Sequence, residues 1–278
     1  MKTRIITAIV LVAILVPVLI FADTPALPIG IAVCAVIAVY EMLSCMGLKK
    51  AILVGAPFYA CAAAFPFLIR YVDSTVLIGD IAFAAISVIV LYLFTVMILS
   101  HGKYTISQMG ALMLSMLYIL IGFSGIEFLH DKVLGGSYLY LMIFIGAWIT
   151  DVFAYFCGML LGRGGKHKLI PDVSPKKTVE GAIGGVVFCV LAMLAFGLIL
   201  EATVDFRTNL LVFAAAGLVA SVVSQVGDLS MSVIKRTYGI KDYGKIFPGH
   251  GGILDRFDSI LAVSIVLTVF TRFLNFMY

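Results

Sequence analysis

A block of polar residues near the C-terminal end carries the strongest sign of chemistry in this chain. Nine Lys, Arg, His and Asp side chains lie between residues 235 and 258, and long apolar segments flank them on both sides. Charged side chains are costly to keep at a membrane boundary, so such a cluster indicates a working site. Its mixture of cations and carboxylates favours a charged, phosphate-bearing substrate.

The segment just before this block predicts a polar stripe along an apolar helix. Its polar residues recur every three or four positions, the spacing of one helix face, and they are Ser221, Ser224, Asp228, Ser232 and Lys235. After the loop, Asp255 and Asp258 are i, i+3 neighbours on the first turn of the last apolar segment. Because consecutive helices joined by a modest loop tend to pack side by side, we expect Asp228 and Asp255 to approach each other.

Two carboxylates with hydroxyl groups nearby form a hard oxygen site of the kind that Mg²⁺ prefers. The block also offers cations for phosphate oxygens, namely Lys235, Arg236, Lys241 and Arg256. His250 precedes Gly251 and Gly252, where a backbone without side chains can come close to a ligand. The structural alternatives are a polar seam between two helices and a histidine that only decorates the surface.

A second polar group opens an earlier apolar segment, and its sequence is Ser174-Pro-Lys-Lys-Thr-x-Glu-Gly181. Ser174 or Thr178 is expected to cap the helix, and Glu180 suits its first turn. A helix N-terminus with free N–H groups, flanked by Lys176 and Lys177, is a ready site for phosphate. The plainer interpretation is an ordinary helix cap beside lysines that mark the cytoplasmic side of a membrane.

A third polar group lies in the preceding apolar segment. Asp151, Tyr155 and Gly158 recur at i, i+4 and i+7 and share one helix face. Asp151 would lie roughly 16 Å from the end of its helix, where a carboxylate needs a partner, a proton or a metal. A bond between two helices would satisfy it equally well. The basic loop that follows, residues 162–168, either binds a ligand or is a solvated loop attracted to anionic lipid.

Composition places the whole chain in a membrane. Of its 278 residues, 63% are hydrophobic and 12% are charged, and the mean hydropathy is +1.16, which excludes a soluble protein of this size. Apolar runs near 20 residues predict an all-α, polytopic membrane protein. The nine predicted spans are 3–22, 27–46, 51–70, 76–100, 108–128, 137–161, 180–201, 209–234 and 253–275. We expect one membrane-embedded domain, residues 1–278, with N-terminal helices to about residue 130 and catalytic helices and cytoplasmic loops from about residue 137.

The distribution of basic residues predicts the orientation. With the N-terminus in the cytoplasm and nine spans, 15 of the 19 Lys and Arg residues face inward. The C-terminus then lies outside, and all three polar groups lie on the cytoplasmic side. The small net charge of +4 gives no indication of nucleic-acid binding.

The polar block resembles the signature of the phosphatidate cytidylyltransferases, also called CDP-diacylglycerol synthases. Residues 232–258 read Ser-x-Ile-Lys-Arg-x4-Lys-Asp-x-Gly-x2-Phe-Pro-x-His-Gly-Gly-Ile-x-Asp-Arg-Phe-Asp and match that signature at every specified position. A pattern with so many fixed polar positions is highly specific. The resemblance extends to the polar groups at 151–158 and 174–181, whereas the first four spans match it only in apolar character.

The resemblance implies that CTP and phosphatidate are converted into CDP-diacylglycerol and pyrophosphate at the cytoplasmic (inner) membrane of the cell. It implies Mg²⁺, with a second cation as an open question, held by Asp228 and Asp255. The residues that would contact the reacting phosphates are Lys235, Arg236 and Arg256. Substrate binding is expected from Asp151, Ser174, Lys176, Lys177, Thr178, Glu180, Ser224, Ser232, Lys241, Asp242, His250, Gly251, Gly252 and Asp258.

The expected partners are CTP, phosphatidate in the inner leaflet and membrane lipids. Whether a second copy of the chain forms a homodimer is left open.

A polyprenyl kinase or an archaeal CDP-lipid synthase would use related chemistry without the full signature. A transporter with Asp80, Glu127, Asp151 and Asp228 as coupling carboxylates is the alternative from another class. Asp80, Glu41 and Glu127 belong to no motif, and only pairing between helices is predicted for them.

Overall fold

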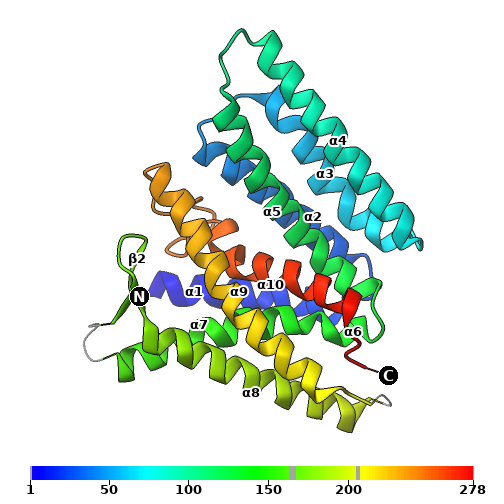
Figure 1. Cartoon of the computed structure of the whole chain (residues 1–278), viewed down its shortest axis with the longest axis vertical. Coiled ribbons are helices and arrows are strands. Elements are labelled where there is room, and N and C mark those ends of the chain that lie inside the picture. Colours follow the sequence, from blue (N-terminus) through cyan, green and yellow to red (C-terminus); the bar gives the residue numbers. More distant parts are fainter. Residues whose placement is uncertain (1, 163–166, 205–206, 278) are drawn as a thin grey trace. The chain divides into compact units, whose positions relative to one another are not determined.

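The computed structural model describes residues 2–162, 167–204 and 207–277, and it is almost entirely helical (Figure 1). Residues 163–166, the central part of the basic loop singled out above, lie outside this description. The helices are α1 (Lys2–Ile20), α2 (Ala26–Cys45), α3 (Ile52–Tyr71), α4 (Thr75–Leu99), α5 (Ile106–Asp131), α6 (Gly136–Leu139), α7 (Leu141–Leu161), α8 (Val179–Thr203), α9 (Leu210–Thr237) and α10 (Leu254–Phe273). Two short strands, β1 (Lys168–Ile170) and β2 (Ser174–Thr178), form an antiparallel hairpin.

The predicted spans agree with the helices to within a few residues, because runs of apolar residues bounded by polar ones decide where each helix begins and ends. Within the described residues, seven helices are long and apolar enough to cross a membrane, so the multi-pass, all-α fold is confirmed and the count of nine is not. The two predicted spans outside these seven are covered by α1 and α10. In α10, charged residues interrupt the apolar run close to its start: Asp255, Arg256 and Asp258.

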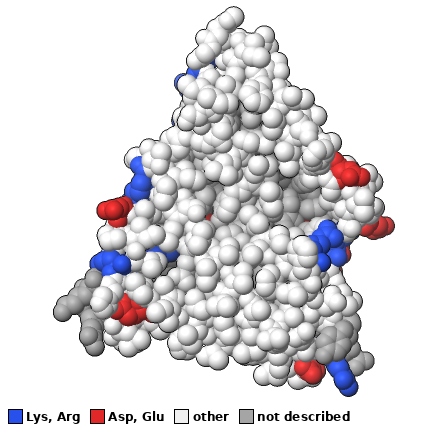
Figure 2. Space-filling model, in the orientation of Figure 1, with Lys and Arg blue, Asp and Glu red and all other residues white. Residues whose placement is uncertain are grey.

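Much of the apolar side-chain surface is exposed rather than packed inside the protein. In α4, for example, Phe83, Leu91 and Ile98 are exposed, and only Ile78, Ile89 and Leu93 are buried. On the face drawn in Figure 2, charged side chains are few and most of the surface is formed by other residues. A surface of this kind fits a hydrocarbon surrounding, since apolar patches of this extent are avoided by water-soluble monomers.

The chain forms two compact units, and each is described by itself. The first consists of residues 1–132 and 242–256, and the second of residues 133–241 and 257–278. The boundary therefore falls within the first turn of α10, between Arg256 and Phe257.

In the first unit, α2 packs against α3 and α5, and α3 also packs against α5 and α4. Leu112, Met116 and Ile119 on α5 and Met42 on α2 are fully buried in its core. The segment 242–256 returns from the second half of the sequence to this unit, where Thr7 donates a hydrogen bond to the carbonyl of Pro248 (3.1 Å).

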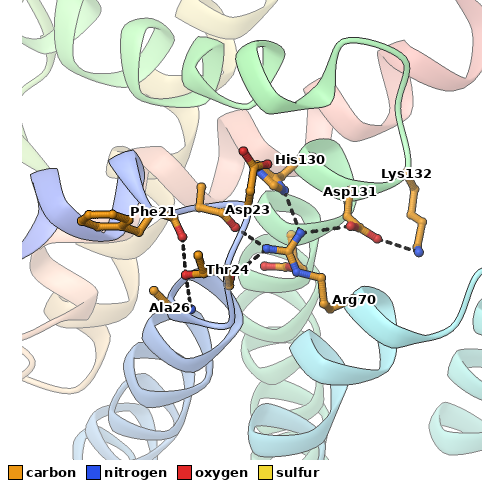
Figure 3. Close-up of polar contacts among 10 residues, drawn as sticks. Phe21, Asp23, Thr24, Ala26, Arg70, His130, Asp131 and Lys132 are labelled. Carbon is orange, nitrogen blue, oxygen red and sulfur yellow. Dashed lines mark hydrogen bonds and ion pairs between the residues drawn. The ribbon is translucent and has the colours of Figure 1, made fainter.

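The half-buried side chain of Arg70 joins three segments of the first unit (Figure 3). Arg70, at the end of α3, lies 3.2 Å from Glu127 and 3.0 Å from Asp131 on α5. It also donates hydrogen bonds to the carbonyl groups of Ala22 and Thr24, in the connection between α1 and α2. The pairing between helices predicted for Glu127 is thus observed, and its partner is Arg70 on α3.

In the second unit, α8 packs against α7 and α9, and small residues allow the close approach. A Cβ atom at Gly185 on α8 would lie 3.0 Å from the carbonyl oxygen of Thr150 on α7. A Cβ atom at Gly181 would likewise meet the backbone of Ala154. Small residues four positions apart, here Gly181 and Gly185, allow two helices to approach closely, and they bring the start of α8 against α7.

Candidate functional site

The polar stripe predicted on α9 is present in the second unit. Ser221, Ser224 and Lys235 are buried, and Asp228 and Ser232 are half-buried, on the side of α9 that faces away from the exposed Val222, Val226 and Val233. The helical spacing predicted this arrangement because residues three and four positions apart lie on the same face.

An ion pair connects the hairpin to this stripe. Lys177 Nζ on β2 lies 2.5 Å from Asp228 Oδ2 on α9. The sequence predicted both residues as candidates, yet it placed Lys177 with the phosphate groups and Asp228 with the metal. Their direct contact neutralises the carboxylate and fixes the hairpin beside the C-terminal half of α9.

Asp258 on α10 brings a second buried carboxylate to the same place. It interacts electrostatically with Asp228, Lys235 and Asp151, and its Oδ1 accepts hydrogen bonds from the N–H (2.9 Å) and the hydroxyl (3.3 Å) of Ser259. Carboxylates that crowd together repel one another, and the ammonium groups of Lys177 and Lys235 offset this repulsion. The second unit thus assembles three aspartates and two lysines from β2, α7, α9 and α10.

Asp151 has a partner that the sequence did not reveal. Its Oδ2 accepts a hydrogen bond from the hydroxyl of Ser259 on α10 (3.3 Å). The side chain of Asp151 itself is exposed. Ser259 is the one site residue that lies just beyond the polar signature, and the only sequence signal for it was a hydroxyl directly after Asp258.

The start of α8 decides between the two predicted helix caps. Thr178 Oγ1 accepts a hydrogen bond from the N–H of Gly181 (3.1 Å), which makes Thr178 the N-cap. Ser174 does not cap the helix, because residues 174–178 extend as strand β2 and leave Ser174 at the far end of the strand. Glu180 lies in the first turn, as predicted, and its Oε1 is 2.5 Å from Nδ1 of His167.

The His-Gly-Gly part of the signature belongs to the first unit and forms a tight turn. The N–H of Phe247 donates to the carbonyl of Gly251 (2.9 Å), and the N–H of His250 donates to the carbonyl of Phe247 (2.8 Å). Gly251 has a φ of 84°, in the left-handed region that glycine adopts without strain. Nδ1 of His250 is buried and has no hydrogen-bond partner among the described residues.

Asp255 organises the same segment. Its Oδ2 accepts hydrogen bonds from the N–H groups of Tyr243 (2.8 Å) and Gly252 (3.0 Å). Asp255 is buried within the first unit, whereas Asp228 belongs to the second. Their expected pairing around a metal ion therefore stays a prediction.

The remaining candidates are mostly exposed. Arg236 donates a weak hydrogen bond to the carbonyl of Ile240 (3.4 Å) at the end of α9. The other exposed candidates are Lys176, Lys241, Asp242 and Arg256.

The family follows from a comparison over nearly the full chain. The model of the cytidylyltransferase family matches residues 2–274. The chain belongs to this family. The resemblance that rested on the polar signature is thereby confirmed for the first four spans as well, which carry no motif.

Relatives within the family agree with this assignment. The chain is 34% identical to a phosphatidate cytidylyltransferase of Staphylococcus haemolyticus over 269 residues, which cover 97% of this chain and 98% of the relative. It is 35% identical, over 274 residues and with the same coverage, to the protein of the same name from Staphylococcus aureus strain COL. Since a transporter is not a cytidylyltransferase, the family excludes that alternative.

Sequence reasoning missed the role of one residue, Glu41, that shapes the signature segment. Glu41 on α2 accepts hydrogen bonds from the N–H groups of Ile253 and Leu254. The residue was noticed, and pairing between helices was all that was predicted for it. Its signal was a carboxylate in an otherwise apolar segment, which must find donors when it is buried.

Proposed function

We propose that this protein transfers the cytidylyl group of CTP to phosphatidate, giving CDP-diacylglycerol and pyrophosphate for phospholipid biosynthesis. The observation that carries this proposal is the full match of residues 232–258 to the signature of a family whose relatives are named for the reaction. The cluster of three aspartates and two lysines in the second unit supports it, because two anionic substrates require both charge neutralisation and precise placement.

The reaction joins two phosphates. A phosphate oxygen of phosphatidate attacks the α-phosphorus of CTP, and the bond from this phosphorus to the oxygen that bridges to the β-phosphorus breaks. Pyrophosphate leaves with that oxygen and its electron pair. Because the attacking phosphate is already an anion, the protein needs no strong general base, and its residues act by binding, orientation and electrostatic stabilisation.

The cations have distinct positions for this task. Lys235 is buried beside Asp258, whereas Arg236 and Arg256 are exposed and can contact the phosphates of a nucleotide that binds from solution. In this proposal Lys235, Arg236 and Arg256 neutralise the phosphate oxygens of the transition state and of the leaving pyrophosphate. Lys176 and Lys177, just before the N-terminus of α8, hold the second phosphate group.

The residues around Asp228 fit a hard cation by the chemistry of their donors. The hydroxyl groups of Ser221 and Ser224 lie on the same face of α9 as Asp228, and within the described residues they have no hydrogen-bond partner. Oxygen donors of this type suit Mg²⁺. Within the same residues, no group of three or more His, Cys, Asp and Glu side chains is arranged so that it could hold a metal ion. Our proposal of Asp228 and Asp255 as metal ligands thus rests on the signature and not on an observed arrangement of ligands.

When bound, Mg²⁺ would shield the repulsion between the two substrates. Lys177 contacts one oxygen of the Asp228 carboxylate, Oδ2, from the strand just before α8. In this proposal the same ammonium group offsets negative charge on a substrate phosphate that binds beside Asp228.

The membrane setting belongs to the same proposal. We propose that the protein lies in the cytoplasmic membrane, with its N-terminus in the cytoplasm and its C-terminus outside. The support is the charge bias, in which 15 of the 19 Lys and Arg residues face inward for this orientation. Phosphatidate then enters from the inner leaflet, and CTP enters from the cytoplasm.

The experiment is an assay of the full chain, purified in detergent, with CTP, phosphatidate and a series of Mg²⁺ concentrations. We expect CDP-diacylglycerol to form only when all three are present. Asp228→Asn and Asp255→Asn should abolish turnover while the protein stays folded, as judged by its helical circular dichroism. Product formation without Mg²⁺, or wild-type rates in either variant, would refute the metal assignment.

A further inference from the structure

Glu41 holds the beginning of α10 from a helix more than 200 residues earlier in the chain. The N–H of Ile253 donates to Glu41 Oε1 (3.0 Å), and the N–H of Leu254 donates to Oε2 (2.9 Å). Glu41 is buried near the end of α2, with 2% of its surface exposed. Both oxygens of one buried carboxylate are thus used to bind two consecutive amides, which a helix leaves unpaired at its N-terminus.

The segment 242–256 is shaped to receive this carboxylate. A Cβ atom at Gly244 or at Gly252 would overlap the Glu41 side chain. Both positions are therefore glycines because the backbone passes directly against the carboxylate. The second glycine of the His-Gly-Gly turn serves this contact with α2, and a ligand is not needed to explain it.

Glu41 and Asp255 share one run of backbone donors. The N–H of Gly252 donates to Asp255 Oδ2, and the next two N–H groups donate to Glu41. Three consecutive amides are thus bound by two carboxylates that interact electrostatically with each other. The position of Asp255 depends on the turn at Gly252, and the position of that turn depends on Glu41.

We propose that Glu41 is a positioning residue for Asp255 and for the His-Gly-Gly turn, an inference that rests on the proposed function. It fixes the first amides of α10, so that the Asp255 carboxylate keeps one orientation before any ligand arrives. Groups that orient ligand residues in this way commonly alter ion affinity and activity without touching the substrate.

Two variants test the proposal in the full chain. Glu41→Gln keeps the size of the side chain but offers one acceptor oxygen, and Glu41→Ala removes both. We expect turnover to fall by roughly ten- to a hundredfold in Glu41→Ala and less in Glu41→Gln, and the Mg²⁺ concentration for half-maximal rate to rise. Asp80→Asn on α4, which removes an exposed carboxylate of the same unit, is the matched control and should behave as wild type.

Hydrogen–deuterium exchange provides a readout that does not depend on activity. In Glu41→Ala, the amides of residues 252–254 should exchange roughly tenfold faster or more, because two hydrogen bonds to a charged acceptor are lost. Exchange in α5, in the core of the same unit, should stay unchanged. If Glu41→Ala does not fold, the same comparison is made with Glu41→Gln.

Each outcome decides the question. Unchanged exchange at 252–254, unchanged turnover, or faster exchange throughout the chain would overturn the positioning role. A rate loss that is equal at all Mg²⁺ concentrations would also overturn it, since it would reflect a smaller folded fraction. If wild-type protein makes no CDP-diacylglycerol, the proposed function fails, while the exchange data still judge whether Glu41 holds the turn.

Discussion

Lys177 and Asp228 form an ion pair of 2.5 Å that joins strand β2 to helix α9 in the second unit. Both side chains are only partly exposed, and Asp228, Lys235 and Asp151 all interact electrostatically with Asp258. The pair brings together the two polar groups that the sequence singled out separately, the one before α8 and the one along α9. This ion pair therefore joins the two polar groups into one site.

Removing the Lys177 ammonium tests this role. Lys177→Ala should lower turnover by roughly a hundredfold, because a cation aimed at phosphate oxygens acts mainly in the transition state. Its free energy of unfolding should change by less than about 1 kcal/mol, since partly exposed ion pairs contribute little to stability. Initial rates and chemical denaturation in detergent measure the two effects.

Lys177→Arg, which keeps the charge, is the matched control and should retain most of the activity. If Lys177→Ala instead lost stability and kept its turnover number, the ion pair would serve only to hold the hairpin in place.

The Arg70 network makes a prediction about stability alone. Arg70→Leu leaves the fully buried Glu127 without its ion-pair partner on α3 and should cost about 3–5 kcal/mol of unfolding free energy. The double variant with Glu127→Leu should recover much of this loss, because an apolar pair can replace a buried ion pair. Thermal unfolding in detergent measures both.

Lys49→Leu, at an exposed position of the same unit, is the control for a lost positive charge. Equal stability of the single and the double variant would contradict the account, since it would mean that Arg70 acts only through the carbonyl groups that it binds.

The close approach of α7 and α8 can be tested by adding volume at one glycine. A side chain at Gly185 meets the backbone of Thr150, so Gly185→Val should cost about 1–3 kcal/mol or more. At Gly79 on α4 an added Cβ would meet no atom of the described residues within 4 Å beyond the backbone of its own helix, and Gly79→Val should be nearly neutral or stabilising. The difference in unfolding midpoint between the two variants is the measurement, and the absence of a difference would contradict the packing.

Local patterns predicted a large part of the fold and of the site. Apolar runs located the helices, and the three-or-four spacing predicted the stripe from Ser221 to Lys235 on α9. The hairpin β1–β2 was not predicted, because its strands are short, are mostly exposed and show no alternation of apolar residues. That omission also left Ser174 as one of the two expected caps, although Ser174 begins strand β2 and Thr178 alone directly precedes the helix.

Contacts between distant parts of the sequence were beyond prediction. Glu41 meets Ile253 across 212 residues, and Asp151 meets Ser259 across 108. Nothing in the residues near Glu41 specifies these donors, because backbone N–H groups are the same at every position but proline. The sequence indicates that burying such a carboxylate costs free energy, and only the fold shows which donors form hydrogen bonds with it.

The central claim is that the cytidylyl group, rather than a phosphate group, moves to the lipid. The most direct measurement follows radioactive label from CTP that carries it either at the α-phosphorus or at the γ-phosphorus, with phosphatidate and Mg²⁺ present. The α-label should appear in a lipid that contains cytidine, and the γ-label should leave as pyrophosphate. Transfer of the γ-label to the lipid would identify a kinase and contradict the account, as would a lipid that carries neither label.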